Sequence, residues 1–241
     1  MRTIRITGTG SALPGRIVTN KELEQLVETS DEWIRERTGI AERHVSVGET
    51  VVTLASEAAR KALEQAGKRA EEIDLILVAT CSPEQYLPCC ACQVQADIGA
   101  VNALAFDVNA ACSGFLFALN TADAYLRTGL AENALIIGSE VLSKLVDWTD
   151  RSSCILFGDG AGAVVVEQCG TESRAVEYGN ALPVVEEKRI PAAGILGRSL
   201  HSDGTGGGVL QCGARKLTTP YARTSAVKTD QNQTTDSREH Y

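Results

Sequence analysis

The chain has 241 residues, 44% of them hydrophobic and 22% charged, and a net charge of −8 at pH 7. A chain of this size and composition can bury a substantial core, as one large domain or two small ones. The negative charge argues against non-specific binding of nucleic acid, since that affinity comes from lysine and arginine neutralising phosphates, and no apolar run reaches the length that would span a bilayer.

Glycines follow the first apolar run, which covers residues 4–7 and alternates like a strand. Gly8 and Gly10 lie where a nucleotide-binding turn would come, but Pro14 stands where the helix of such a fold should begin, and the spacing is not G-x-G-x-x-G. A second glycine cluster, at 158–162, leads into a strand and not into a helix N-terminus. We therefore expect both clusters to serve tight turns and close chain packing.

Two short helices are predicted next. A capping box at residues 19–22 opens a helix whose apolar side lies within residues 23–27. Further on, Trp33 and Arg37 are four residues apart, so they share one helix face. An aromatic plane beside a guanidinium can hold an adenine and a phosphate, although a tryptophan taken alone more often anchors a core.

The middle of the chain alternates helical and strand patterns. Residues 50–66 repeat apolar side chains at helical spacing and end at Gly67, a C-terminal stop. Residues 73–80 are nearly all apolar, as expected for a strand covered on both faces. Further apolar runs of strand length follow at residues 104–108, 134–137 and 163–166. Strands that alternate with helices predict an α/β protein with a largely parallel sheet.

The densest thiol cluster is formed by Cys81, Cys89, Cys90 and Cys92. It lacks the two C-x-x-C pairs of a metal site, and the three histidines lie far away in the sequence. We expect small buried side chains at a helix start after Pro88, and no bound metal. Because the eight cysteines form no disulfide framework and no signal peptide precedes them, we expect a cytoplasmic protein with reduced thiols.

Cys112 lies between the run at 104–108 and a helical pattern at 115–126 that ends at Gly129. The N–H groups at a helix start are unpaired and carry partial positive charge, which favours the thiolate, the nucleophilic form of cysteine. Small residues flank Cys112 and leave room for a substrate. The alternative is a buried cysteine that behaves as a small hydrophobe.

The composition changes toward the C-terminus. Residues 168–193 mix glycine, proline and charges, with 175–178 and 184–185 as candidate edge strands. Residues 213–241 sustain no helical or strand period, and we expect a poorly ordered polar tail there. The predicted divisions of the chain are 1–167, an atypical 168–212, and 213–241.

Four short motifs follow one another along the chain. They are T-S-D-E-W-I with R-T-G-I at 29–40, A-A-C-S-G-F at 110–115, D-R at 150–151 and F-G-D-G-A-G-A at 157–163. Together they resemble the β-ketoacyl-[acyl-carrier-protein] synthase III family of the thiolase superfamily, with a shorter echo at 194–204. The resemblance implies a thiolase-like fold whose first half is of the βαβαβαββ type, with a mostly parallel sheet and helices, and whose second half is incomplete.

The resemblance implies a chemistry for Cys112. This thiol would take an acyl group from acyl-CoA, usually acetyl-CoA, as a thioester, beside an oxyanion hole of backbone N–H groups. Malonyl-[acyl-carrier-protein] would then lose carbon dioxide, and its enolate would attack the thioester to give a 3-oxoacyl product, the first condensation of type II fatty-acid synthesis. The implied protein is a homodimer that needs no cofactor, since acyl-CoA is a substrate.

The resemblance also implies binding residues. Thr29 and Arg37 would contact the nucleotide end of CoA. Trp33 and Arg151 would hold the adenine between them. The acyl-pocket positions of the family are matched by Leu87, Leu142 and Phe157. Of these, Leu87 would reach across the homodimer interface.

Two motifs of the family do not occur in these 241 residues. In the family, a histidine in an H-Q-A-N motif and an asparagine in an N-x-G-N-T-S-like motif stabilise the enolate. His44 lies on the CoA side, His201 matches a position that is not catalytic, and His240 is in the polar tail. We therefore expect a chain truncated after the first half of the fold, with an exposed apolar sheet face and little or no condensing activity.

Two other functions fit part of this pattern. Another thiolase-fold CoA acyltransferase would share Cys112 and the CoA site but use a different acyl donor or acceptor, and a panel of acyl-CoA primers would identify it. A non-catalytic subunit that pairs with an intact synthase would account for the missing histidine and asparagine but leave Cys112 without a purpose. Co-purification with a full-length synthase would identify that subunit.

Overall fold

The computed structural model describes residues 3–169, 194–195, 197–206 and 211–212. Contacts between Cα atoms divide the chain into two compact units, Met1–Leu200 and His201–Tyr241. The described part of the second unit holds one short 3-10 turn, Gly204–Gly206. The candidate edge strands at 175–178 and 184–185 and the predicted tail at 213–241 lie outside the described residues. The predicted divisions after residues 167 and 212 therefore stay predictions.

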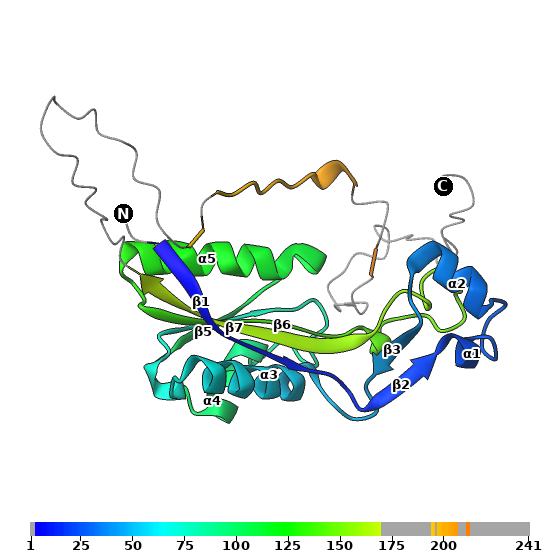
Figure 1. Ribbon diagram of the computed structural model, residues 1–241, viewed down its shortest axis with the longest axis horizontal. Helices are drawn as coiled ribbons and strands as arrows, with labels where there is room; N and C mark the ends of the chain where they lie inside the picture. The colour runs from blue at the N-terminus through cyan, green and yellow to red at the C-terminus, as the bar shows by residue number, and fades with distance from the viewer. Residues whose placement is uncertain (1–2, 170–193, 196, 207–210, 213–241) are drawn as a thin grey trace, which may run out of the picture. The chain divides into compact units, whose positions relative to one another are not determined.

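A five-stranded sheet forms the centre of the first unit (Figure 1). Its strands, in spatial order, are β1 (Thr3–Ala12), β7 (Asp159–Cys169), β6 (Asn133–Val141), β4 (Leu75–Ala79) and β5 (Leu104–Val108). The helices between them along the chain are α3 (Val51–Ala66), α4 (Cys90–Ile98) and α5 (Gly114–Thr128). This order confirms the α/β class and the βαβαβαββ pattern.

The sheet is mixed, with parallel pairing on one side only. β4 runs parallel to β5 and to β6, and helices α4 and α5 form the crossovers. β7 runs antiparallel to both β6 and β1. β7 runs antiparallel to β6 because the segment that connects them, which is fully described, contains no crossover α-helix. A direct return of this kind gives antiparallel strands. The mostly parallel arrangement of the prediction is thus confined to β5, β4 and β6.

Helices cover both faces of this sheet, with α3 and α4 on one face and α5 on the other (Figure 1). In β4, Ile76 and Val78 belong to the core under α3 and α4. Leu75 and Leu77 belong to the core under α5, and all four side chains are fully buried. Burial on both faces explains why this strand is apolar throughout.

The ends of the long helices follow the predicted signals. Thr50 caps α3, its Oγ1 accepting a hydrogen bond from the Thr53 N–H at 3.1 Å. Gly67 ends α3 with φ 65°, and Gly129 ends α5 with φ 78°. Glycine adopts this left-handed conformation without steric cost, which is why these residues predict the helix ends well.

The cysteine cluster lies at the start of α4, just after Pro88 as predicted. Cys90 is fully buried in the core between α4 and the sheet. Cys89 and Cys92 are only partly buried, as is Cys81 in the preceding loop. The prediction of buried small side chains therefore holds for Cys90 alone, because it is the member of the cluster that belongs to the core.

Gly8 and Gly10 lie within β1, so the predicted turn at this point is wrong. The register shifts between Ile6 and Gly8, and β1 then stays paired with β7 as far as Ala12. A Cβ at Gly8 would clash with the carbonyl oxygen of Ala62, and one at Gly10 with that of Ala58, both in α3. The close packing that was predicted for these glycines is confirmed, since only a hydrogen atom lets strand and helix approach this far.

A Gly10→Ala substitution is expected to lower the free energy of unfolding by at least about 2 kcal/mol, because α3 must move away from β1. Gly162→Ala is the matched control, since Gly162 lies in the neighbouring strand β7 and a methyl group added there would meet open space. This control should change stability by less than about 0.5 kcal/mol. Urea unfolding followed by circular dichroism measures both, and equal losses would contradict the close packing.

One stretch of the sheet face toward α5 is open. Ile6 pairs with Val166 of the core under α5, and 53% of its surface is exposed. A shallow hollow of about 430 Å³ is lined by Thr9, Gly10, Phe115, Gly138, Gly162, Ala163 and Val164. Exposed apolar sheet surface is thus present at Ile6 of β1, whereas Ala163 and Val164 of β7 are buried or half-buried.

A two-stranded sheet follows β1 along the chain. β2 (Arg16–Thr19) pairs antiparallel with β3 (Glu42–Val45). Two short helices connect these strands, α1 (Asn20–Leu23) and α2 (Asp31–Thr38). A separate small core is formed by Leu23, Ile34, Cys154 and Ile155. It holds both helices against the segment that leads from β6 to β7.

The capping box predicted at residues 19–22 is present at α1, but the helix is shorter than predicted. Thr19 accepts a hydrogen bond from the Glu22 N–H at 3.4 Å, and Glu22 Oε1 accepts one from the Thr19 N–H at 3.1 Å. After Leu23 the chain tightens, with the Leu26 N–H donating to the Leu23 carbonyl three residues back. This turn leaves Leu26 60% exposed, outside the predicted apolar side.

Candidate functional site

The predicted site residues that follow the main-sheet strands gather at one edge of the sheet. The parallel strands β5, β4 and β6 end at this edge, and antiparallel β7 begins there. In open α/β sheets, ligands bind at the carboxyl ends of the parallel strands. The residues placed beyond these strand ends are Cys112, Leu87, Leu142 and Phe157.

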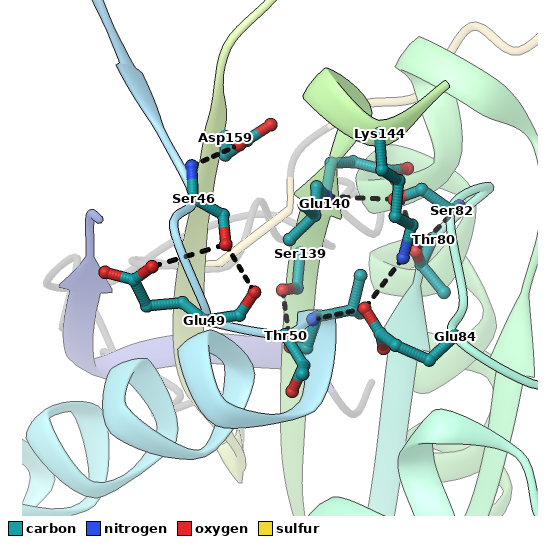
Figure 2. A network of polar contacts seen from close by, with 12 residues as sticks. Ser46, Glu49, Thr50, Thr80, Ser82, Glu84, Ser139, Glu140, Lys144 and Asp159 are labelled. Carbon is teal, nitrogen blue, oxygen red and sulfur yellow. Dashed lines mark hydrogen bonds and ion pairs between the residues drawn. The ribbon is translucent and has the colours of Figure 1, made fainter. Parts of the chain in front are cut away.

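A network of polar side chains fixes the loops at this edge (Figure 2). Glu140 in β6 accepts hydrogen bonds from the Cys81 N–H at 2.7 Å and from Thr80 Oγ1 at 3.2 Å, both just beyond β4. Asp159, the first residue of β7, accepts one from the Ser46 N–H at 2.7 Å. Each carboxylate joins segments that are distant in sequence, so the site is built on fixed strand ends.

Cys112 is exposed at the turn from β5 to α5. It lies in a 3-10 turn, Ala111–Ser113, directly before the first residue of α5. Ser113 precedes α5 in the N-cap position and makes no side-chain capping bond among the described residues. The structure therefore places the thiol where the sequence predicted it, at a helix start whose first N–H groups have no such cap.

The backbone beside Cys112 is strained. Ala111 has φ 45°, the left-handed region that alanine rarely adopts. A Cβ at Gly114 would lie 3.2 Å from the Ala79 Cβ, so the start of α5 sits close against the end of β4. Strain of this kind persists where the surrounding structure imposes it, and it clusters at active sites.

The structure brings two of the predicted acyl-pocket residues to one place. Val141 pairs with Asp159 at the end of the β6–β7 ladder, so Leu142 and Phe157 lie just beyond it, both half-buried. Leu87 lies in the loop before α4 and is 85% exposed. The pocket role of these residues stays a prediction.

Two arginines stack on the Trp33 ring. The Cζ of Arg37 is 4.4 Å from the ring centroid and that of Arg151 is 4.6 Å from it. Arg37 is one turn further along α2, whereas Arg151 comes from the segment between β6 and β7, where its Nη1 donates to the Glu28 carbonyl at 3.0 Å. An adenine between Trp33 and Arg151 would need two stacking distances of about 3.5 Å each, so Arg151 would have to swing outward to admit it.

Thr29 comes directly before Ser30, the N-cap residue of α2, and its hydroxyl stands out. Its Oγ1 is buried and has no hydrogen-bond partner among the described residues. The next residue, Ser30, caps α2 by accepting a hydrogen bond from the Trp33 N–H at 3.1 Å. Because a buried polar group without a partner is costly, the Thr29 hydroxyl fits a group that a ligand or water satisfies.

Asn20 and Arg43 hold this part of the site together, and no sequence pattern singles them out. Arg43 in β3 donates to Asn20 Oδ1 at 2.9 Å and to the Ile155 carbonyl at 3.1 Å. Asn20 Nδ2 donates to Asp31 Oδ1 at 2.8 Å. Burial lowers the pKa of Arg43. The pair thus ties α2 to the segment that carries Arg151.

The described residues contain no group of three or more His, Cys, Asp or Glu side chains that could hold a metal ion. His44 Nδ1 lies 2.6 Å from the Pro14 carbonyl oxygen. His201 is exposed in the second unit, and His240 lies outside the described residues. No helix in the described ranges is both long and apolar enough to cross a membrane.

Known proteins with similar sequences were found for this chain. A family model described as 3-Oxoacyl-[acyl-carrier-protein (ACP)] synthase III matches residues 106–204. Beta-ketoacyl-[acyl-carrier-protein] synthase III of Clostridium acetobutylicum is 47% identical over 222 residues, which cover 92% of this chain and 62% of the relative. The protein of that name from Novosphingobium aromaticivorans is 53% identical over 200 residues, which cover 83% of this chain and 57% of the relative.

A solved structure agrees with this similarity. The crystal structure of 3-oxoacyl-[acyl-carrier-protein] synthase III from Aquifex aeolicus superposes with a TM-score of 0.67 and 52% sequence identity. The superposition covers 68% of this chain and 53% of that one. The chain therefore spans between 57% and 62% of the length of these two curated relatives.

Proposed function

The chain belongs to the β-ketoacyl-[acyl-carrier-protein] synthase III family, and on this premise we propose that it transfers an acyl group from acyl-CoA, acetyl-CoA in the first instance, to its own Cys112. The observation that carries this proposal is the exposed thiol of Cys112 at the start of α5, beside the strained Ala111. An exposed nucleophile at a helix N-terminus on the carboxyl edge of a parallel sheet suits acyl transfer.

In the proposed reaction the Cys112 thiolate attacks the thioester carbonyl of acyl-CoA. The bond between that carbonyl carbon and the CoA sulfur breaks, CoA leaves as a thiolate that takes up a proton, and the acyl group remains on Sγ. N–H groups of the first turn of α5 would stabilise the oxyanion of the tetrahedral intermediate. Leu142 and Phe157 would line the acyl pocket, and Leu87 from a second copy in a homodimer would close it.

The second substrate is proposed to be malonyl-[acyl-carrier-protein], in line with the acyl-carrier-protein in the relatives' names. Its decarboxylation gives an enolate that attacks the thioester, so the complete reaction yields a 3-oxoacyl product. The family's histidine and asparagine motifs for that step do not occur in residues 1–241. We therefore infer that this stretch forms the acyl-enzyme and does not complete the condensation. The reaction needs no cofactor, and we place it in the cytoplasm, where cysteines stay reduced.

Exposure of the chain to a panel of acyl-CoA thioesters tests the proposal. Acetyl-CoA is expected to add one acyl group per chain, measured by intact mass, and neutral hydroxylamine should remove it because the linkage is a thioester. A preference for a longer or branched acyl group would favour another acyltransferase of the same fold. A chain that takes an acyl group from no member of the panel would overturn the proposal.

Removing the guanidinium of Arg37 or Arg151 is expected to weaken CoA binding. Arg37→Met and Arg151→Met keep an unbranched stem but lose the charge that stacks on Trp33, so each should raise the dissociation constant of CoA about 5- to 10-fold. Arg35→Met is the matched control, since Arg35 is also exposed on α2 but pairs with Asp31 at 2.9 Å. Isothermal titration with CoA measures all three, and an equal loss in the control would contradict a specific site at Trp33.

A further inference from the structure

The start of α4 carries a pair of thiols that the proposed chemistry does not use. Cys89 and Cys92 have C-x-x-C spacing, and both are partly exposed. Cys89 is the N-cap residue of α4 and, within the described residues, its side chain caps no backbone N–H group of the helix. Cys90 lies between them in sequence but is fully buried in the core.

The N-cap and N3 positions of a helix bring their side chains together, and Cys89 and Cys92 occupy these two positions in α4. At the start of α3 the γ atoms of the same two positions, Thr50 Oγ1 and Thr53 Oγ1, are 3.3 Å apart. Helix geometry puts Cα atoms three residues apart at about 5 Å, within the range that a disulfide bridges. The two thiols are also close enough for Cys89 to raise the pKa of Cys92.

We propose that Cys89 and Cys92 form a reversible disulfide with each other. The oxidant is a low-molecular-weight disulfide such as oxidised glutathione. One thiolate attacks the glutathione disulfide, forming a mixed disulfide and releasing one glutathione thiol. The second cysteine then displaces the other glutathione. Two protein thiols are oxidised, one glutathione disulfide is reduced to two thiols, and the two protons end on the released glutathione.

The surroundings slow the oxidation of this pair, because a raised pKa leaves less of the attacking thiolate, and they change when the disulfide forms. The side-chain interaction with the Cys89 thiol and burial raise the pKa of Cys92, and the negative charge of Asp107 adds to the effect. Asp107 also accepts the Cys90 and Ala91 N–H groups at 2.9 and 2.7 Å, so its charge offsets the positive helix end. In the reduced form Cys92 Sγ donates to the Ala105 carbonyl at 3.6 Å, a bond that a disulfide sulfur cannot make.

The experiment equilibrates the full chain with mixtures of reduced and oxidised glutathione and then unfolds it in urea with excess N-ethylmaleimide, so that every remaining thiol, buried Cys90 included, is blocked. The blocked chain is digested with chymotrypsin. Cleavage after Tyr86 and Phe106 gives a peptide, 87–106, whose only cysteines are Cys89, Cys90 and Cys92. Under oxidising mixtures this peptide is expected to lose two of its three labels and to keep one on Cys90. Apart from the labels, the mass of the peptide should fall by two hydrogens, and dithiothreitol should restore full labelling.

Matched serine variants assign the bond. Cys90→Ser should leave the disulfide intact, whereas Cys89→Ser and Cys92→Ser should each abolish it. Full labelling of the wild-type peptide at every glutathione ratio would overturn the proposal, as would a disulfide that includes Cys90. The wild-type peptide gives these outcomes by itself, so the test still decides the proposal if a variant fails to fold. The same oxidation in urea should scramble the three cysteines, because the helix that selects Cys89 and Cys92 is then absent.

Discussion

A Cys112→Ala variant is expected to take up no acyl group under conditions in which acetyl-CoA acylates the wild-type chain completely. Cys112 is exposed at a helix start, whereas burial raises the pKa of Cys90 to about 12 and also raises the pKa of Cys154. No other described thiol shares both features of Cys112. Because a covalent nucleophile has no substitute, the acylation rate should fall on the order of 10³-fold or more. Radiolabelled acetyl-CoA and acid precipitation measure it.

Cys212→Ala is the matched control for this experiment. Cys212 is also exposed, but it lies in the second unit and outside the described helices. Its loss should leave acylation unchanged. Cys112→Ala should itself alter the free energy of unfolding by less than about 0.5 kcal/mol, since the side chain is exposed, and this separates lost chemistry from lost fold. Label that persists in Cys112→Ala would show that another thiol is the acceptor.

Local signals predicted the elements of this fold well. The all-apolar run in β4 predicts burial on two faces, and Gly67 and Gly129 mark helix ends, because each effect acts within a few residues. The path of β1 through Gly8 and Gly10 could not be predicted in this way. It depends on how closely α3 packs, a contact between segments some 50 residues apart in sequence that no local pattern encodes.

The same difference between local signals and contacts of distant segments applies to the candidate site. The stacking of Arg37 on Trp33 follows from their spacing of four residues within one helix. The meeting of Arg151 with Trp33 joins distant parts of the chain and was expected only through the family resemblance. The bond from Arg43 to Asn20 had no signal at all, since a buried arginine in a short strand looks like a surface residue until its partners are known.

The acylated chain is expected to give no 3-oxoacyl product when malonyl-[acyl-carrier-protein] is added. The developing enolate needs donors aimed at its oxygen, and each such donor is worth about 10²–10³ in rate, so two missing donors cost on the order of 10⁴-fold or more. Among the described histidines, His44 is hydrogen-bonded to the Pro14 carbonyl and His201 is exposed in the second unit. Release of labelled carbon dioxide and formation of 3-oxoacyl-[acyl-carrier-protein] measure this step.

The full-length synthase of Clostridium acetobutylicum serves as the positive control, since this chain aligns with 62% of it. Acylation and condensation then separate cleanly: the chain should match the control in the first and fall short in the second. This split follows from where the groups act, because the helix end acts on Cys112 locally, whereas the enolate needs partners placed around it. Product that forms from wild type and disappears in Cys112→Ala would show that residues 1–241 supply those partners themselves.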